Sequence, residues 1–68
     1  MSGPTAYGDF EHAMRGLLTV VVGEAEIVLA RDDLPGEERR ASVERVVQAA
    51  RQMEQLLTRW REVSGPPP

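Results

Sequence analysis

Apolar residues recur at helical spacing in the first half of the chain. They are Phe10, Met14, Leu17, Val21 and Val28, separated by steps of four, three, four and seven residues. Such steps place side chains on one face of an α-helix. The run 20–22 consists of β-branched Val and would suit a strand, but the helical period on both sides outweighs this local propensity. We therefore predict a helix over residues 10–30, with Asp9 as its N-cap and with Glu24 interrupting the apolar seam. An earlier start of this helix stays open.

The second half carries a stricter apolar repeat. Its members step by three and four residues throughout, as in a heptad seam: Val43, Val46, Ala50, Met53, Leu57 and Trp60. Val47, Leu56 and Val63 widen the stripe beyond what a two-stranded seam needs. A helix tolerates Pro only in its first turn, so Pro35 marks the start of a second helix over residues 35–63.

These patterns predict an all-α chain with one domain over residues 9–63. Residues 1–8 are typical of a linker, and residues 64–68 form a proline-rich tail. Helices of roughly 30 and 40 Å would form an antiparallel hairpin. Two helices cannot cover each other's wide apolar stripes, whereas two hairpins can, as a four-helix bundle. We therefore expect a two-fold symmetric homodimer, with the seam residues of both helices as its core and interface.

Composition narrows the classes of function. The chain has 68 residues, eight Arg, no Lys, eleven acidic residues, one His and no Cys, and its formal net charge is −3. This length holds one small domain, so an ATP-binding domain does not fit beside the hairpin. The absence of Cys argues against disulfides and a structural metal site, and the mild acidity argues against nucleic acid. No stretch suits a membrane span or a secretory signal, which makes a cytoplasmic location the expectation.

The one histidine lies opposite the apolar seam. At about 100° per residue, Gly16, Thr19 and Gly23 all lie within about 40° of His12 around the helix axis. Glycine in a helix costs about 1 kcal/mol relative to Ala, and a function that needs a flat surface would explain it. Neutral imidazole is a nucleophile, and phosphoryl transfer needs mainly an accessible attacking atom. Taken alone, the spacing favours a plainer interpretation, a solvated histidine beside glycines without function.

The stretch from His12 to Glu26 resembles the H-box of sensor histidine kinases, in the variant His-Asp-Phe-Asn-Asn-Leu-Leu-Thr-Val-Ile-x-Gly-x-Ala-Glu. The residues that match it directly are His12, Leu17, Leu18, Thr19, Val20, Gly23, Ala25 and Glu26. Arg15 instead matches the commoner version, His-Glu-Leu-Arg-Thr-Pro-Leu. The Asp-Leu-Pro-x-Glu-Glu-Arg segment that begins at Asp33 and the Leu-Leu-x-x-Trp that ends at Trp60 are also similar. The resemblance thus covers about residues 9–63.

The resemblance implies a dimerisation and histidine-phosphotransfer domain of the HisKA type. In that family two hairpins form a four-helix bundle, and an exposed His passes phosphate from ATP to an Asp of a response-regulator receiver domain. His12 would be the phosphoacceptor. The regulator-docking face would be formed by Arg15, Gly16, Thr19 and Gly23. ATP and Mg would bind only to a separate catalytic domain, so no cofactor is expected in this chain.

Two positions depart from the family's pattern. Ala13 stands where the family usually has an acidic residue that activates the imidazole, and Gly16 stands where it usually has Thr or Asn for dephosphorylating the regulator. We predict weak or absent autokinase activity and weak phosphatase activity, whereas phosphotransfer from a phosphorylated regulator needs mainly the exposed His. Two alternatives stay open. One is a degenerate member that dimerises and binds a partner without phosphotransfer, and the other is an unrelated helical-hairpin adaptor.

Overall fold

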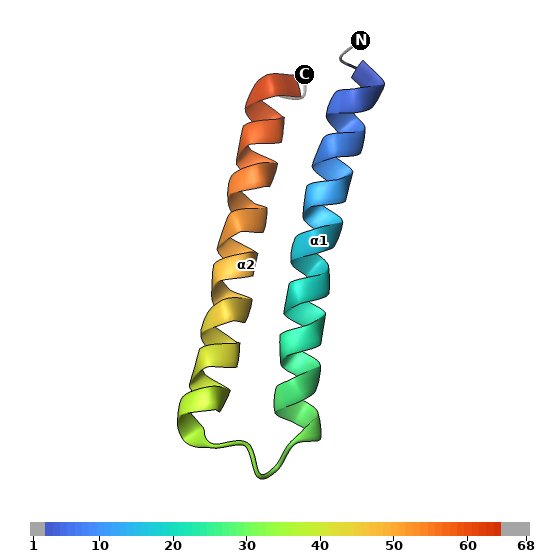
Figure 1. Cartoon of the computed structure of the whole chain (residues 1–68). Helices are drawn as coiled ribbons and strands as arrows, with labels where there is room; N and C mark the ends of the chain where they lie inside the picture. Colours follow the sequence, from blue (N-terminus) through green and yellow to red (C-terminus); the bar gives the residue numbers. More distant parts are fainter. Residues whose placement is uncertain (1–2, 65–68) are drawn as a thin grey trace.

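The computed structural model shows two long α-helices joined by a short turn (Figure 1). It describes residues 3–64, and the side chains of residues 7–62. Helix α1 spans Gly3–Ala30 and helix α2 spans Gly36–Ser64. The helices run antiparallel, so α1 begins beside the point where α2 ends. The predicted all-α hairpin is confirmed.

Helix α1 begins at Gly3, which is the earlier start that the sequence left open beside the one near Phe10. Asp9 lies inside the helix and is not its N-cap, and the predicted linker is helical from residue 3 onward. Pro at position 4 does not prevent this, because the first turn of a helix has no partner for its N–H groups. Packing against α2 supports the added length: the ring of Tyr7 meets Trp60 edge-on at 5.9 Å, and Phe10 stacks on Trp60 at 4.8 Å between centroids.

Helix α2 agrees with its predicted bounds to within one residue at each end. Ser64 belongs to the helix, and the rest of the predicted proline-rich tail lies outside the described residues. Glu37 and Glu38 lie in the first turn of α2, where negative charge interacts favourably with the helix dipole.

The turn between the helices is closed by one of its own side chains and by one from α2. Leu34 is buried, with 7% of its surface exposed. The Nη2 atom of Arg39 donates to the backbone oxygen of Leu34 at 3.4 Å and to that of Arg31 at 3.5 Å. The guanidinium thus donates to carbonyl groups of the turn that follows α1, beside the negative end of the helix dipole. The hairpin end is therefore held by one arginine of α2.

The predicted seam of α1 faces α2, whereas the predicted seam of α2 is divided between the contact with α1 and an exposed surface. The α1 positions are all half-buried: Phe10, Met14, Leu17, Val21 and Val28. On α2, Val46, Met53 and Trp60 are half-buried as well, whereas the other three predicted positions are exposed: Val43, Ala50 and Leu57. Ser42 and Ala49 are the most buried residues of α2, with 3% and 4% exposed. The apolar stripe of α2 is wide, and α1 covers only one of its edges.

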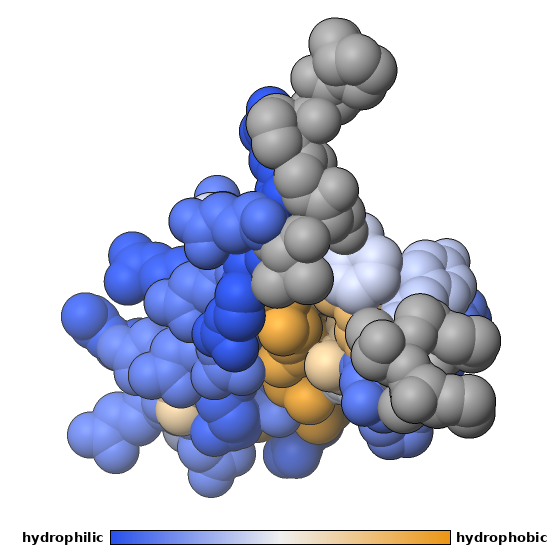
Figure 2. Space-filling model, turned by 90° about the horizontal axis from the view of Figure 1, so that it is seen from above, coloured by the Kyte–Doolittle hydropathy of each residue, from blue (hydrophilic) through white to orange (hydrophobic). Residues whose placement is uncertain are grey.

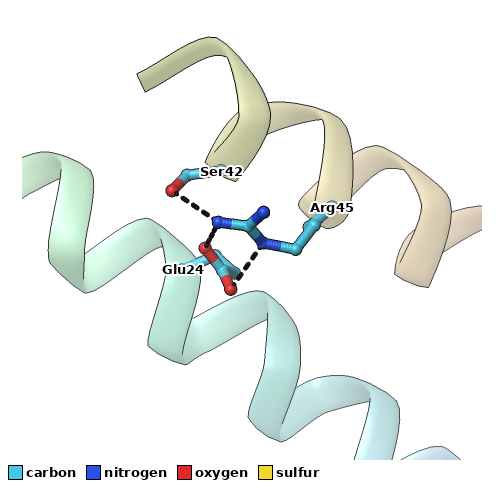
Figure 3. A network of polar contacts seen from close by, with 3 residues as sticks. All are labelled: Glu24, Ser42 and Arg45. Atoms are coloured by element: carbon cyan, nitrogen blue, oxygen red, sulfur yellow. Dashed lines mark hydrogen bonds and ion pairs between the residues drawn. The ribbon is translucent and has the colours of Figure 1, made fainter. Parts of the chain in front are cut away.

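An ion pair links the two helices where the apolar seam of α1 is interrupted (Figure 3). The Nε and Nη2 atoms of Arg45 donate to the two carboxylate oxygens of Glu24 at 2.9 and 3.1 Å. Nη2 also donates to the hydroxyl oxygen of Ser42 at 3.3 Å. The Glu24 side chain is only 19% exposed. A two-pronged contact of this kind has one geometry, so it fixes the register of α1 against α2.

Acid is expected to weaken the hairpin through Glu24. The hydrogen bond from Arg45, assisted by Ser42, lowers the pKa of Glu24 from its ordinary value of 4.5. Its stabilising effect is therefore fully present above the ordinary pKa and is lost as the pH falls through the lowered pKa of the folded state. Glu24→Gln should lower the melting temperature by several degrees at neutral pH and should remove this part of the acid dependence. Thermal melts followed by circular dichroism across the acid range check both effects.

The matched control for that experiment is Glu44→Gln. It breaks an exposed ion pair within α2, in which Arg40 Nε lies 3.4 Å from Glu44 Oε2. Exposed pairs of this kind contribute little to stability, so the control should melt almost as the parent does. Equal losses in the two variants would contradict a special role for the pair between the helices.

Candidate functional site

The His12 side chain is exposed on the outer side of α1. Its neighbours Phe10, Met14 and Leu17 turn toward α2, which leaves the imidazole pointing away from the hairpin interior. Within the described part of the chain, no hydrogen bond or ion pair engages the imidazole. The ring nitrogens are thus accessible to a second molecule.

Glycines lie one helical turn before and one turn after His12, at Gly8 and Gly16. A Cβ atom built at either glycine would meet nothing within 4 Å, and the same holds at Gly23 farther along the helix. Packing within the hairpin therefore does not require these glycines. What they provide is open space along the helix face that carries the histidine.

The residues predicted to dock a regulator occupy two adjoining surfaces. Arg15, Thr19 and Gly23 border one shallow hollow on α1, which Leu18, Val22 and Glu26 complete. The Thr19 hydroxyl donates to the backbone oxygen of Arg15 at 2.9 Å. Arg15 itself is exposed, and its Nη2 atom lies 3.1 Å from Oε2 of Glu11. Gly16 faces a different hollow, between the two helices.

The hollow beside Gly16 is a groove between α1 and α2 that the sequence did not predict. Its lining residues are Ala13, Gly16, Leu17 and Val20 from α1, and Gln52, Gln55, Leu56 and Arg59 from α2. A second hollow shares Leu17, Val20 and Gln52 with it and extends it along the hairpin. Neither lining includes an acidic side chain. The one available signal was the helical spacing of the chain's glutamines at positions 48, 52 and 55.

Neither departure from the H-box pattern is compensated nearby. Ala13 is half-buried beside the groove and offers no charge or hydrogen bond to the imidazole. Glu11 precedes His12, but its carboxylate is paired with Arg15. The arrangement therefore presents a nucleophile without a side chain that would activate it. Among the described residues no group of three or more His, Cys, Asp or Glu lies close enough to hold a metal ion.

Another surface of the hairpin is apolar, and the rest of the described chain does not cover it. Its large residues are exposed to between 43% and 82%: Leu18, Val22 and Leu29 of α1, and Val43, Val47 and Leu57 of α2. At about 100° per residue these six lie together, on the flank of the hairpin opposite the groove. Figure 2 looks down on the open end, where hydrophobic side chains gather between the helices and hydrophilic ones cover the outer side of α2. We call the six residues the apolar flank.

Replacing Gly16 by Ala is expected to stabilise the hairpin by up to about 1 kcal/mol, because α1 gains a better helix former. The added methyl group meets nothing within 4 Å, so no clash offsets this gain. Denaturant unfolding of the variant measures it, and Gly23→Ala serves as a second position with the same open space. A loss of stability in both variants would show that the glycines are needed for packing after all.

Comparisons of the chain with protein-family models, with curated proteins and with solved structures give no match. Within residues 3–64, neither helix has an apolar stretch of the length that crossing a bilayer requires. The exposed histidine, the glycines around it and the apolar flank are the features on which a function can be argued.

Proposed function

We propose that this chain is a dimerisation and histidine-phosphotransfer module of a two-component signalling system. His12 would receive a phosphoryl group and pass it to an aspartate of a response-regulator receiver domain. The observation that carries this proposal is the setting of the imidazole. It is exposed on the outer side of a long helix, it has no partner among the described residues, and open space lies one turn away on either side.

The chemistry asks little of this chain beyond that setting. A lone pair of an imidazole nitrogen attacks phosphorus while the bond from phosphorus to the donor oxygen breaks. In the second half-reaction the receiver's carboxylate attacks phosphorus, and the electron pair of the P–N bond returns to the imidazole. Both steps need access in line with the bond that breaks, and positioning provides most of the catalysis. The glycines before and after His12 add no side chain that would crowd the imidazole.

The partners follow from the surfaces. Two hairpins would cover the apolar flank of each other in a four-helix bundle, since an exposed patch of this kind marks an interaction site. A receiver domain would approach His12 over Arg15, Gly16, Thr19 and Gly23, and the groove beside Gly16 would extend that contact. Leu18 and Val22 also border the hollow beside Arg15, but they would belong to the dimer interface. A catalytic domain that binds ATP and Mg would be a separate unit. We place this function in the cytoplasm, where receiver domains act, and without a nucleic-acid partner.

A second candidate function is that of an adaptor that dimerises and binds a partner without phosphoryl transfer. Ala13 and Gly16 favour it, because they remove both side chains that would assist the histidine. An unrelated helical-hairpin scaffold would account for the apolar flank equally well. Neither alternative gives a reason for an exposed imidazole with a glycine one turn away on each side.

Transfer from a phosphorylated receiver domain tests the proposal. Purified receiver domains are first loaded with labelled phosphate from a small-molecule phosphodonor and are then mixed with the full chain. We expect an acid-labile, alkali-stable label on the chain, located at His12 by mass spectrometry. A chain that binds a receiver domain but takes no label from any of them would overturn the proposal in favour of the adaptor.

A further inference from the structure

We propose that Glu11 holds Arg15 while His12 is unmodified, and that Arg15 leaves Glu11 for the phosphoryl group once His12 carries one. The inference rests on the proposed function, which it deepens by naming the residues that set the lifetime of the phosphoryl group. Arg15 then acts as a positioning residue for phosphohistidine, a role separate from docking a regulator.

The geometry places all three side chains on neighbouring parts of α1. Arg15 Nη2 lies 3.1 Å from Glu11 Oε2, in a pair one helical turn apart. His12 directly follows Glu11 and precedes Arg15 by three residues, and residues three apart are neighbours on a helix surface. Gly16 follows His12 by one turn, and a Cβ there would meet nothing within 4 Å, so no side chain at that position crowds the imidazole. Because the two positions are neighbours on the helix surface, rotation of the long Arg15 side chain would carry its guanidinium from the carboxylate toward a group on His12.

The competition favours the phosphoryl group. The Arg15 and Glu11 side chains are 74% and 51% exposed, and pairs this exposed are weak. A phosphoryl group brings about two negative charges and three acceptor oxygens, and it accepts two parallel hydrogen bonds from a guanidinium. At equal distance the attraction is about twice that to a carboxylate. Asp9 is exposed and lies one turn before His12, so its negative charge would repel the phosphoryl group. The positive charge of Arg15 would offset this repulsion.

The exchange would make Glu11 and Arg15 opposing controls on phosphohistidine. Arg15 stabilises the phosphorylated form and so slows loss of the phosphoryl group. Glu11 competes for the same guanidinium and repels the phosphoryl charge, so it shortens the lifetime. With no acidic residue directly after His12, Glu11 and Arg15 are the ion-paired charges next to it that can adjust the site.

Chemical phosphorylation tests the exchange without any partner protein. Phosphoramidate reacts with histidine directly: the imidazole nitrogen bonds to phosphorus as the bond from phosphorus to the amino nitrogen breaks, and ammonia leaves with that electron pair. The full chain and the variants Arg15→Gln, Glu11→Gln and the double variant are phosphorylated in this way. The half-life of the phosphoryl group is then followed by ³¹P NMR. Circular dichroism confirms that each variant keeps its helices, as substitutions at exposed positions should.

We expect Arg15→Gln to shorten the half-life about threefold, the size of an exposed charge-assisted contact. Glu11→Gln should lengthen it, and this effect should shrink when Arg15 is already absent, which is the signature of coupled residues. The Arg15 Nε resonance should move on phosphorylation in the parent chain. The matched controls Arg40→Gln and Glu44→Gln, which break the exposed pair of α2, should leave the half-life unchanged.

The proposed exchange of Arg15 would be overturned by either of two results. One is an Arg15→Gln variant whose phosphoryl group has the same half-life as in the parent, and the other is an Arg15 Nε resonance that does not shift on phosphorylation. Failure of the proposed function would be visible elsewhere, as a chain that no receiver domain phosphorylates. The two failures are therefore distinguishable, because the chemical phosphorylation does not depend on a receiver.

Discussion

Replacing His12 by Gln is expected to abolish phosphoryl transfer from a receiver domain to the chain and to leave its fold intact. Glutamine is polar and of similar length, but its amide nitrogen is not a nucleophile. The imidazole is exposed and makes no hydrogen bond or ion pair among the described residues, so the hairpin loses no contact. The acid-labile label should fall to background, while the helical signal and the melting temperature stay those of the parent.

Glu44→Gln is the matched control for that experiment. Glu44 is exposed on α2, away from the surface over which a receiver domain would approach, so it tests the effect of a polar change elsewhere on the hairpin. The control should be labelled as the parent is. Label that persists in His12→Gln would place the phosphoryl group on another residue. A variant that loses binding to the receiver domain along with the label would show that His12 docks rather than transfers.

The sequence predicted the local parts of the fold well, because the hydrophobic period and Pro35 are local signals. The sequence-based prediction failed for features that depend on contacts between the two helices. The start of α1 was placed near Phe10 because Gly and Pro near the beginning suggested a linker, whereas Tyr7, before the predicted start, packs on Trp60 of α2. Glu24 had no explanation in the pattern, because its partner Arg45 lies 21 residues away in the sequence.

The apolar stripe of α2 is another feature whose contacts the sequence alone does not determine. The heptad seam through Val43, Ala50 and Leu57 is present, but in a single hairpin these residues are exposed. The edge that meets α1 runs one residue earlier, through Ser42 and Ala49. A wide stripe has two edges, and the sequence does not say which edge meets which neighbour. For the candidate site, the outward direction of His12 followed from helical geometry. The groove beside Gly16 could not be predicted in this way, because it depends on which sides of the two helices face each other.

The second large effect is expected from a substitution at the exposed edge of the apolar stripe of α2. Replacing Leu57 by Asp is expected to prevent dimerisation and to remove most of the helical signal at low concentration. Leu57 is 51% exposed in one hairpin and lies on the apolar flank. Fully burying a leucine side chain contributes about 1.5–3 kcal/mol. About half of Leu57 is already covered in the hairpin, so each copy loses roughly half of that amount, and a two-fold interface loses it twice. An unpaired carboxylate in each copy adds a further cost, so the dimer should weaken by more than about a hundredfold.

One hairpin has little to hold it together once the dimer is lost. Among residues 7–62, Leu34 and Ala49 are the apolar residues below a tenth exposed, and Ser42 is the one buried polar residue. Sedimentation equilibrium and melts at several concentrations measure the effect, because the stability of a dimer rises with concentration. Gln55→Asp, on the groove side of the same helix, is the matched control and should dimerise as the parent does. A parent chain that melts at the same temperature at every concentration would argue against the four-helix bundle, and with it against covering of the apolar flank by a second copy.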